Sequence, residues 1–346
     1  MMFSFIIPFI ALYGGLEAKS NMSDMFVTRP PPTFSAKIVC NIFTDFTAEQ
    51  RKFCMKHPRL TSAIAKGIET GLRECENQFQ HHRWNCISTY EIASFGQNRS
   101  VQGTKEGAFV NAIVAAGAAH SVALACARNN ITGCICATSN WENGGCSNNI
   151  AHGIETSERF LQGSRGAKRK RYELQIMHNR EAGRQAVRKS LVPHCNCHGV
   201  SGACTSKTCW EILSSSFERV GRFLKARYET ATLVEPSYTD TREGKTPIVL
   251  ILPGTVFVKP RKEKLVYLDK SPTYCDPIPN KGVAGTRARL CDHLSKDTDG
   301  CDALCCGRGY NKIVFTTTKR CRCRFFWCCE VKCATCKIER EQTVCK

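Results

Sequence analysis

A serine enclosed by cysteines is the feature of this sequence most suited to chemistry. Residues 195–210 read Cys-Asn-Cys-His-Gly-Val-Ser-Gly-Ala-Cys-Thr-Ser-Lys-Thr-Cys-Trp, with Ser201 between two pairs of cysteines. Disulfides across this segment would form a hairpin with a hydroxyl at its tip, and Gly199 and Gly202 suit the positive φ angles and close approach of such a turn. Four cysteines can pair in three ways, and the sequence alone does not choose among them.

Three alternative roles for the segment around Ser201 involve no modification of its hydroxyl. Residues 199–203 nearly match the Gly-x-Ser-x-Gly nucleophile elbow and would make Ser201 and His198 parts of an extracellular hydrolase, but that elbow needs a buried strand before it and a helix directly after it. The second is a passive hairpin. The third is a zinc site, which would lack the Cys-x-x-Cys knuckle; its ligands would be Cys195, Cys197, His198 and Cys204. We expect neither an enzyme nor a metal site.

The cysteine content and the N-terminus both indicate secretion. The chain has 24 cysteines in 346 residues, and an oxidising secretory route would pair them as disulfides. Residues 1–18 fit a secretory signal peptide, because an apolar run from Phe3 to Leu12 is followed by small residues, with cleavage expected after Ala18.

Sequons for N-glycosylation agree with a lumenal route. They begin at Asn21, Asn98 and Asn130. Asn98 and Asn130 lie in polar, turn-like contexts, where an oligosaccharide could point to solvent.

The chain is strongly basic, with a formal net charge of +19. In a secreted protein this charge favours sulfated polysaccharide or anionic cell surfaces over nucleic acid. The densest basic run, residues 165–171, has three interpretations: a solvated loop, a heparan sulfate contact, or a proprotein cleavage site after Arg171.

Apolar spacing predicts helices in the first two-thirds of the chain. Thr47-Ala-Glu-Gln50 is a capping-box pattern for a short helix ending before Pro58. The Ala-rich segment 108–127 lacks the sustained hydrophobicity of a membrane span and is expected to be a buried helix within about 104–128. Further helices are predicted from Leu60 to Phe79, Tyr172 to Leu191 and Cys209 to Tyr228.

Strands are predicted after residue 230. Residues 248–252, 255–258 and 264–268 are short β-branched and aromatic runs separated by turn residues. From Cys275 to Cys345 the chain holds twelve cysteines in 71 residues, with too little apolar material for an ordinary core. Disulfides must therefore hold this last region together.

A second segment bracketed by cysteines has apolar residues at its centre. Residues 324–331 read Arg-Phe-Phe-Trp-Cys-Cys-Glu-Val. Nested pairing of Cys321 with Cys336 and of Cys323 with Cys333 would make a second stapled hairpin, whereas a buried core strand would not need that scaffold. Exposed aromatic residues on a rigid tip are typical of a binding hot spot.

These motifs, in order along nearly the whole mature chain, resemble the signature of the Wnt family of secreted signalling proteins. The first hairpin carries the His-Gly-x-Ser-Gly core of that signature at residues 198–202. The other matching segments are Gln78–Cys86, Gly144–Ser147, His178–Gly183, Leu265–Pro272, Gly285–Arg287 and Asp299–Tyr310.

The resemblance implies an α+β, disulfide-rich, two-domain Wnt-like fold. A helical N-terminal domain would span residues 19–234 and carry the acylated hairpin at 195–209. A linker at 235–260 would lead to a small cysteine-rich β domain at 261–346, with a receptor-binding tip at 324–331.

In the family the serine of the hairpin core carries an ester-linked monounsaturated fatty acyl chain, so the resemblance assigns that lipid to Ser201. A Porcupine-type membrane-bound O-acyltransferase would attach the chain, a Wntless-type carrier would export the ligand, and the lipid would associate it with membranes. The ligand would bind the cysteine-rich domain of a Frizzled-type receptor, with a low-density-lipoprotein-receptor-related co-receptor. The implied receptor-binding positions are His198, Gly199, Val200, Ser201 and Gly202 on the first tip and Phe325, Trp327, Cys328, Cys329 and Val331 on the second.

The resemblance also implies a pairing for all 24 cysteines. The pairs are Cys40 with Cys54, Cys75 with Cys86, Cys126 with Cys134, Cys136 with Cys146, Cys195 with Cys209, Cys197 with Cys204, Cys275 with Cys306, Cys291 with Cys301, Cys305 with Cys345, Cys321 with Cys336, Cys323 with Cys333, and the adjacent residues Cys328 and Cys329.

The implied function is that of a secreted, acylated ligand that activates Wnt signalling in development and in cell-fate or polarity control. It would act as a morphogen in the extracellular space and matrix and at the cell surface. The alternative from another class is a non-acylated, heparin-binding matrix or growth-factor-like protein that acts through charge alone. That alternative predicts salt-sensitive binding and no role for Ser201.

Overall fold

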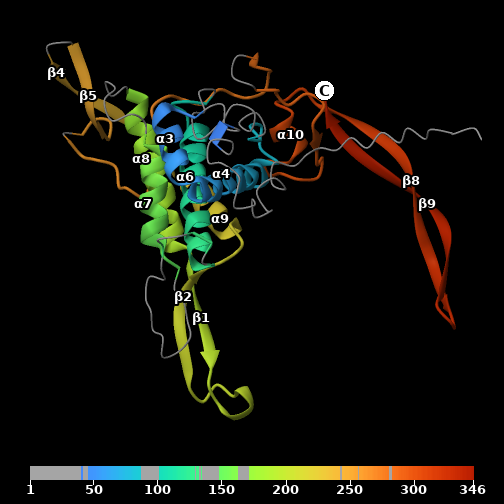
Figure 1. Cartoon of the computed structure of the whole chain (residues 1–346). Coiled ribbons are helices and arrows are strands. Elements are labelled where there is room, and N and C mark those ends of the chain that lie inside the picture. The colour runs from blue at the N-terminus through green and yellow to red at the C-terminus, as the bar shows by residue number, and fades with distance from the viewer. Residues whose placement is uncertain are drawn as a thin grey trace, which may run out of the picture. The chain divides into compact units, whose positions relative to one another are not determined.

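The computed structural model describes most of the chain after residue 39. The described residues are 40–41, 46–86, 101–128, 130–131, 134, 148–162, 171–241, 244–255, 257–279 and 283–346. The chain from Ser35 to Lys346 forms one compact unit. Its long helices come first along the chain and most of its strands follow, which is the order of the predicted α+β fold (Figure 1).

Local capping accounts for the first helices. α3 (Ala48–Lys56) begins after Thr47, whose hydroxyl accepts the backbone N–H of Gln50, while the Gln50 side chain accepts the backbone N–H of Thr47. This reciprocal capping box confirms the predicted start of the helix. α4 (Pro58–Phe79) follows and buries one apolar face along its length, as its sequence spacing predicts.

The centre of the helical part is α6 (Lys105–Ala127). It contacts α4, α7 (Ile150–Leu161), α8 (Arg171–Lys189) and α9 (Glu218–Glu229) (Figure 1). By length and composition α6 could cross a membrane, but 78% of its most apolar window is buried inside the protein. It is therefore the buried core helix that the Ala-rich sequence predicts.

Glycine allows the neighbours of α6 to pack closely against it. A Cβ added to Gly183 of α8 would lie 1.9 Å from the carbonyl oxygen of Ala112, and one added to Gly117 would lie 2.1 Å from that of Gly67. Both distances are well inside van der Waals contact, so the helix backbones approach directly at these positions.

The helix predicted from Cys209 to Tyr228 is wrong in its first part. Its first five residues belong to strand β2 (Lys207–Leu213), and α9 starts only at Glu218. β2 pairs antiparallel with β1 (Leu191–Cys197), and Cys195 lies opposite Cys209. The partner strand and the cross-link override the helical spacing of the apolar side chains.

The segment predicted as a linker contains a β-hairpin. β4 (Glu235–Thr241) pairs antiparallel with β5 (Gly244–Ile251), which covers most of the predicted strand 248–252. Residues 255, 257 and 258 are not in a strand, contrary to the prediction for 255–258. β3 (Thr232–Leu233) pairs in parallel with β6 (Val266–Tyr267), inside the predicted strand 264–268.

A buried carboxylate joins α6 to segments far along the chain. Glu106, in the first turn of α6, accepts hydrogen bonds of 2.6–2.8 Å from the hydroxyls of Tyr228, Ser271 and Tyr274. Burial, followed by the Glu106 charge, raises the pKa of both tyrosines, so both phenols remain protonated donors. The cluster ties the helices to the beginning of the cysteine-rich region.

The C-terminal region has little hydrophobic core of its own. β7 (Leu290–Cys291), β9 (Glu330–Cys345) and β8 (Tyr310–Phe326) form a sheet in the order β7-β9-β8, and the short helix α10 (Cys301–Leu304) contacts β9. The buried cluster here consists of Cys301, Leu304, Cys305 and Cys345. Disulfides are therefore the main restraint on this region.

Candidate functional site

The hairpin that carries Ser201 is held by nested disulfides. Cys195 is bonded to Cys209 and Cys197 to Cys204, the pairing that the resemblance implies. β1 and β2 pair over seven residues with an unbroken register. The two bonds therefore limit twisting and fraying of the strands up to the turn.

The turn at the tip depends on two glycines that act in different ways. The 3-10 turn η3 (Val200–Gly202) holds Gly202 at φ 80°, which glycine adopts without steric cost. A Cβ added to Gly199 would lie 2.1 Å from the carbonyl oxygen of Ala203, so the absence of a side chain lets the turn close. Ser201 has φ 59°, a left-handed conformation that costs a non-glycine residue about 1–2 kcal/mol. The fold thus holds Ser201 in a fixed turn conformation.

The tip is open to solvent. Residues 200–207 are all exposed, and Val200 is 92% exposed. His198 Nε2 forms a 3.0 Å hydrogen bond with the Thr208 hydroxyl, and within the described part of the chain no hydrogen bond joins His198 to Ser201. A serine nucleophile requires a base within hydrogen-bond reach. In the described structure the tip thus presents an accessible Ser201 hydroxyl, and the imidazole of His198 is engaged with Thr208.

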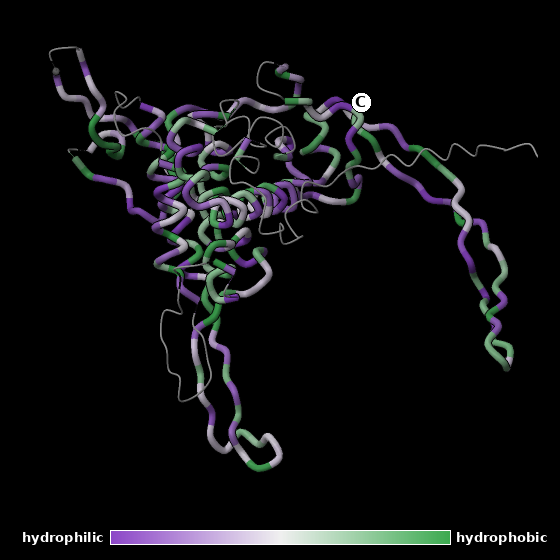
Figure 2. Tube along the Cα trace, in the orientation of Figure 1, coloured by the Kyte–Doolittle hydropathy of each residue, from purple (hydrophilic) through white to green (hydrophobic). Residues whose placement is uncertain are grey.

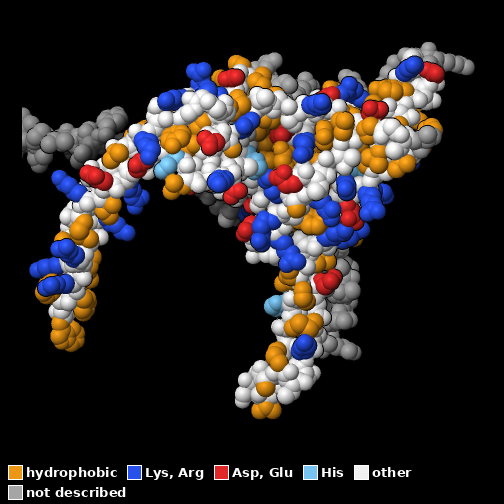
Figure 3. All heavy atoms as spheres, turned by 180° about the vertical axis from the view of Figure 1, so that it is seen from behind, with side chains coloured by type: hydrophobic (Ala, Val, Ile, Leu, Met, Phe, Trp, Pro, Cys, Tyr) orange, Lys and Arg blue, Asp and Glu red, His pale blue; other side chains and the backbone are white. Residues whose placement is uncertain are grey.

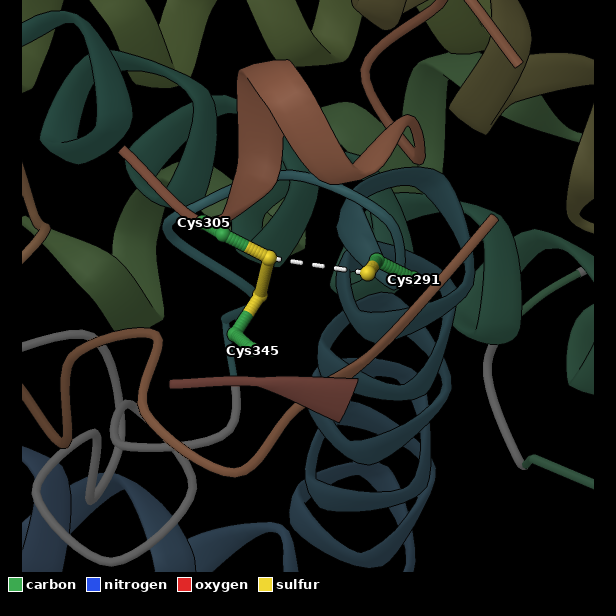
Figure 4. A group of neighbouring side chains, drawn as sticks. All are labelled: Cys291, Cys305 and Cys345. Atoms are coloured by element: carbon green, nitrogen blue, oxygen red, sulfur yellow. Dashed lines mark hydrogen bonds between the residues drawn. A yellow bond between two sulfur atoms is a disulfide. The ribbon is translucent and has the colours of Figure 1, made fainter. Parts of the chain in front are cut away.

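The cysteines of the zinc interpretation are all occupied as disulfides, so they offer no thiolate ligands. In the C-terminal region the sulfurs of Cys291, Cys305 and Cys345 lie within 4.8 Å of one another (Figure 4). Cys305 is bonded to Cys345, and Cys291 is bonded to Cys301. This cluster is therefore a pair of neighbouring disulfides, in which the Cys305 and Cys291 sulfurs are 3.5 Å apart.

The second hairpin, β8 and β9, is stapled near its tip. Cys321 is bonded to Cys336 and Cys323 to Cys333, and the strand register shifts between Cys321 and Arg324. Pairing begins at Tyr310, so the hairpin is longer than the bracketing cysteines alone indicate. The disulfides lie in the half of the ribbon that is furthest from the buried cysteine cluster.

Hydrophobic residues lie at the end of this hairpin (Figure 2), and their side chains gather on the surface there (Figure 3). Phe325 is 69% exposed, Trp327 is 93% exposed and Val331 is 59% exposed. Phe326, which is not among the implied receptor-binding positions, is 48% exposed, and the Lys332 ammonium lies 5.5 Å from its ring centroid. Its position beside Trp327 in an apolar run could have identified it. The tip has the composition of a protein-binding surface.

Cys328 and Cys329 differ from the expected arrangement. Both are exposed free thiols, whereas the resemblance implies a bond between them. The two residues follow Trp327 in the turn between β8 and β9 and have left-handed φ values of 78° and 84°. Strand pairing and the Cys323–Cys333 bond hold the tip closed without a further cross-link.

Six further disulfides match the implied pairing; they are Cys40–Cys54, Cys75–Cys86, Cys126–Cys134, Cys275–Cys306, Cys291–Cys301 and Cys305–Cys345. Asn130, the start of one sequon, is exposed. The remaining expectations lie outside the described residues; they concern the signal peptide at 1–18, the sequons at Asn21 and Asn98, the Cys136–Cys146 pair and the basic run from 165 to 170.

The fold and the two hairpins together define a class of extracellular binding protein. A disulfide-rich α+β protein with two stapled hairpins, one ending in an accessible hydroxyl and the other in exposed aromatic rings, is suited to binding at an extracellular surface.

Comparison with known proteins agrees with an extracellular binding protein and identifies its family. The model of the wnt family matches residues 43–346. The chain is 38% identical to "Protein Wnt-16" of Bos taurus over 86% of this chain and 85% of the relative, and 38% identical to "Protein Wnt-16" of Mus musculus over the same shares. A chain in the solved structure "Human WLS in complex with WNT8A" superimposes with a TM-score of 0.61 at 28% identity, covering 89% of this chain and 99% of that chain.

The chain belongs to the Wnt family. It is a secreted ligand of Wnt signalling, a class that acts in development, and nothing in the comparisons favours a matrix protein acting through charge alone.

Proposed function

We propose that Ser201 carries an ester-linked monounsaturated fatty acyl chain and that this lipid is one of two contacts with a Frizzled-type receptor. The observation that carries the proposal is the exposed Ser201 hydroxyl, held in a left-handed turn at the end of a doubly cross-linked hairpin. A membrane-bound acyltransferase can reach such a hydroxyl without unfolding the helical core. Family membership supports the same modification.

The lipid would supply most of the binding energy at this tip. Each methylene buried in an apolar groove contributes about 0.8 kcal/mol, so roughly ten methylenes contribute on the order of 8 kcal/mol. The protein part of the tip is small and rich in glycine and alanine, with Val200 as its one large exposed apolar side chain among residues 198–204. The positions His198 to Gly202 therefore serve mainly to present the chain and to contact the rim of the groove.

The second proposed contact is the tip of β8 and β9. Phe325, Trp327 and Val331 supply exposed apolar area, and Cys328 and Cys329 lie with Trp327 in the turn at the end of the hairpin. Aromatic side chains on a preorganised turn lose little entropy on binding. Two contacts on one ligand raise the overall affinity above that of either contact when the receptor engages both.

The other proposed partners follow from the lipid and the charge. A Porcupine-type acyltransferase would esterify Ser201, and a Wntless-type carrier would shield the lipid during export; the similarity to the chain solved in complex with human WLS supports the carrier. A low-density-lipoprotein-receptor-related co-receptor would complete the signalling complex. The net charge of +19 supports retention by heparan sulfate in the matrix and at the cell surface. In this proposal the protein is a ligand without catalytic activity or metal.

Receptor binding by matched variants tests the proposal. Ser201→Ala removes the acceptor hydroxyl, and Ser206→Ala removes another exposed hydroxyl from the same tip while keeping its backbone carbonyl, which accepts the His198 N–H. We expect Ser201→Ala to weaken binding to a Frizzled cysteine-rich domain by at least about a hundredfold, and Ser206→Ala to bind like the wild type. Equal binding by all three proteins, with strong dependence on salt, would instead support the charge-driven alternative.

A further inference from the structure

Tyr238 differs from the other tyrosines of the described structure in its accessibility. It is 48% exposed, whereas the other described tyrosines are half-buried or buried. The hydroxyls of Tyr172, Tyr228 and Tyr274 donate to buried or half-buried carboxylates. Among the described residues no hydrogen bond involves the phenol of Tyr238. Its oxygen is therefore available to an enzyme.

The backbone around Tyr238 is extended and lies at the edge of a sheet. β4 pairs with β5 alone, so the other edge of β4 has no partner strand in the described structure. The register of the pair is irregular between Ser237 and Tyr238. An unpaired edge of extended backbone is the form in which many enzymes and domains bind peptide segments, by adding a strand.

The charge around Tyr238 is opposite in sign to that of the whole chain. The segment from five residues before Tyr238 to five residues after it contains one basic residue, Arg242, and three acidic residues. These are Glu235, Asp240 and Glu243, so the net charge of the segment is −2. The chain as a whole carries +19. Lys245 lies opposite Asp240 in the hairpin, but no ion pair joins them in the described structure.

Of the three tyrosines that follow along the chain, Tyr267 and Tyr310 have basic surroundings, and Tyr274, whose window holds two acidic residues and one lysine, is buried. The same window around Tyr267 contains three lysines and two acidic residues, and the window around Tyr310 contains Arg308 and Lys312 and no acidic residue. Accessibility, extended backbone and negative charge thus coincide at Tyr238 and not at these two positions.

We propose that Tyr238 is a site of tyrosine O-sulfation by a lumenal sulfotransferase on the secretory route. The donor of such enzymes, 3′-phosphoadenosine 5′-phosphosulfate, is a polyanion, so the cleft that binds it must be cationic. A cationic cleft selects tyrosines in acidic segments through charge complementarity. Glu235 and Asp240 flank Tyr238 on the same strand and supply that complementarity.

In the transfer step the phenolic oxygen of Tyr238 attacks the sulfur of the donor. A new oxygen–sulfur bond forms, the bond from sulfur to the bridging phosphate oxygen breaks, and adenosine 3′,5′-bisphosphate leaves with that electron pair. The phenolic proton passes to a base of the sulfotransferase. No atom changes oxidation state, so the step needs no further reactant.

The product would alter the surface of the β4–β5 hairpin. A sulfate ester stays ionised at physiological pH and would add one negative charge between Glu235 and Asp240. The strand would then present three anions on a basic protein, which suits a cationic partner surface. This inference depends on secretion and is independent of acylation at Ser201.

Mass spectrometry of protein secreted by animal cells tests the site. The peptide containing Tyr238 is analysed with and without chlorate, which blocks synthesis of the sulfate donor, and by fragmentation that retains sulfate. Phosphatase and arylsulfatase treatments distinguish a phosphate from a sulfate. Tyr238→Phe is the test variant and Tyr267→Phe is the matched control. In parallel, purified lumenal tyrosylprotein sulfotransferase and donor are added to the folded, unmodified protein.

We expect sulfate on the Tyr238 peptide that disappears with chlorate and with Tyr238→Phe, but not with Tyr267→Phe. Glu235→Gln combined with Asp240→Asn should lower the modified fraction several-fold, whereas Glu263→Gln, near Tyr267, should not. The proposal is overturned when the purified enzyme leaves Tyr238 unmodified, when sulfate resides on another tyrosine, or when the group proves to be phosphate.

Discussion

Truncation of the exposed aromatic tip should separate receptor binding from folding. Trp327 is 93% exposed, so Trp327→Ala removes almost no internal packing and should change the free energy of unfolding by no more than about 0.5 kcal/mol. A receptor that covers the side chain would bury about 150–250 Å². At about 25 cal/mol per Å² this area corresponds to about 4–6 kcal/mol as an upper bound.

Hot-spot truncations at interfaces usually realise part of such a bound, commonly about 2–4 kcal/mol. We therefore expect Trp327→Ala to weaken binding to the Frizzled cysteine-rich domain by about 30-fold to 700-fold. Surface plasmon resonance on the acylated protein measures this change, and thermal unfolding measures stability. The proposed acyl group on Ser201 is left intact by this substitution, so its contribution is constant in the comparison.

A pair of phenylalanines provides the control for this experiment. Phe325 at the tip is 69% exposed and Phe257, outside both tips, is 68% exposed. Phe325→Ala should weaken receptor binding, whereas Phe257→Ala should leave it unchanged. Equal losses for the two variants, or a Trp327→Ala protein that binds normally, would refute the assignment of this tip to the receptor. Loss of secretion or of thermal stability in Trp327→Ala would refute the claim that the tip has no structural role.

Three further predictions concern the scaffold. Gly183→Ala places a Cβ 1.9 Å from the Ala112 carbonyl oxygen and should destabilise the protein by about 1–3 kcal/mol in chemical denaturation. Glu106→Gln removes the charge that accepts three hydroxyl donors and should lower the free energy of unfolding by about 1–3 kcal/mol, with little effect in a binding assay on the folded protein. Burial, followed by the charge of Lys225, lowers the pKa of His82 from 6.5 to about 4. Between these two pH values the unfolded chain binds more protons than the folded protein, so the free energy of unfolding decreases as the pH falls from 6.5 to about 4. After a discount for solvent screening, the expected decrease is about 1–2 kcal/mol. His82→Gln should flatten that pH dependence in thermal unfolding, and an unchanged slope would contradict the assignment.

Elements determined by local interactions could be predicted from the sequence. The Thr47–Gln50 capping box gives the start of α3, and the Ala-rich composition identifies α6 as a core helix. The cysteine spacing around residues 195–209 and 321–336 indicates two cross-linked hairpins, whereas the nested pairing in the first is implied only by the family resemblance. In these segments neighbouring residues carry much of the information that specifies the local structure.

Elements determined by distant partners could not be predicted in the same way. Residues 209–213 have helical spacing but form a strand because β1 lies opposite them. The segment 235–251 has the charged, turn-rich composition of a linker, yet β4 and β5 pair across it. The spacing of apolar residues indicates which face of a helix or strand is buried. Strand pairing depends in addition on which other segment of the chain lies alongside in the fold.

In the candidate site, too, some features could be predicted from the local sequence and others could not. The sequence identifies Ser201 and the aromatic tip, but it gives neither the left-handed backbone of Ser201 nor the hydrogen bond between His198 and Thr208. It also does not show that Cys328 and Cys329 are free thiols in a turn in which both residues have positive φ. Exposure of Tyr238 likewise becomes visible only once the strands are placed.

The central claim, a fatty acyl ester on Ser201, is tested most directly by peptide mass spectrometry on protein secreted by animal cells. The fragment spanning Ser201 and Ser206 is measured before and after hydroxylamine or mild base, and fragmentation assigns the modified residue. The account predicts a monounsaturated acyl mass on Ser201 that is lost on hydrolysis, with Ser206 unmodified. Active, secreted protein with an unmodified Ser201 would contradict it.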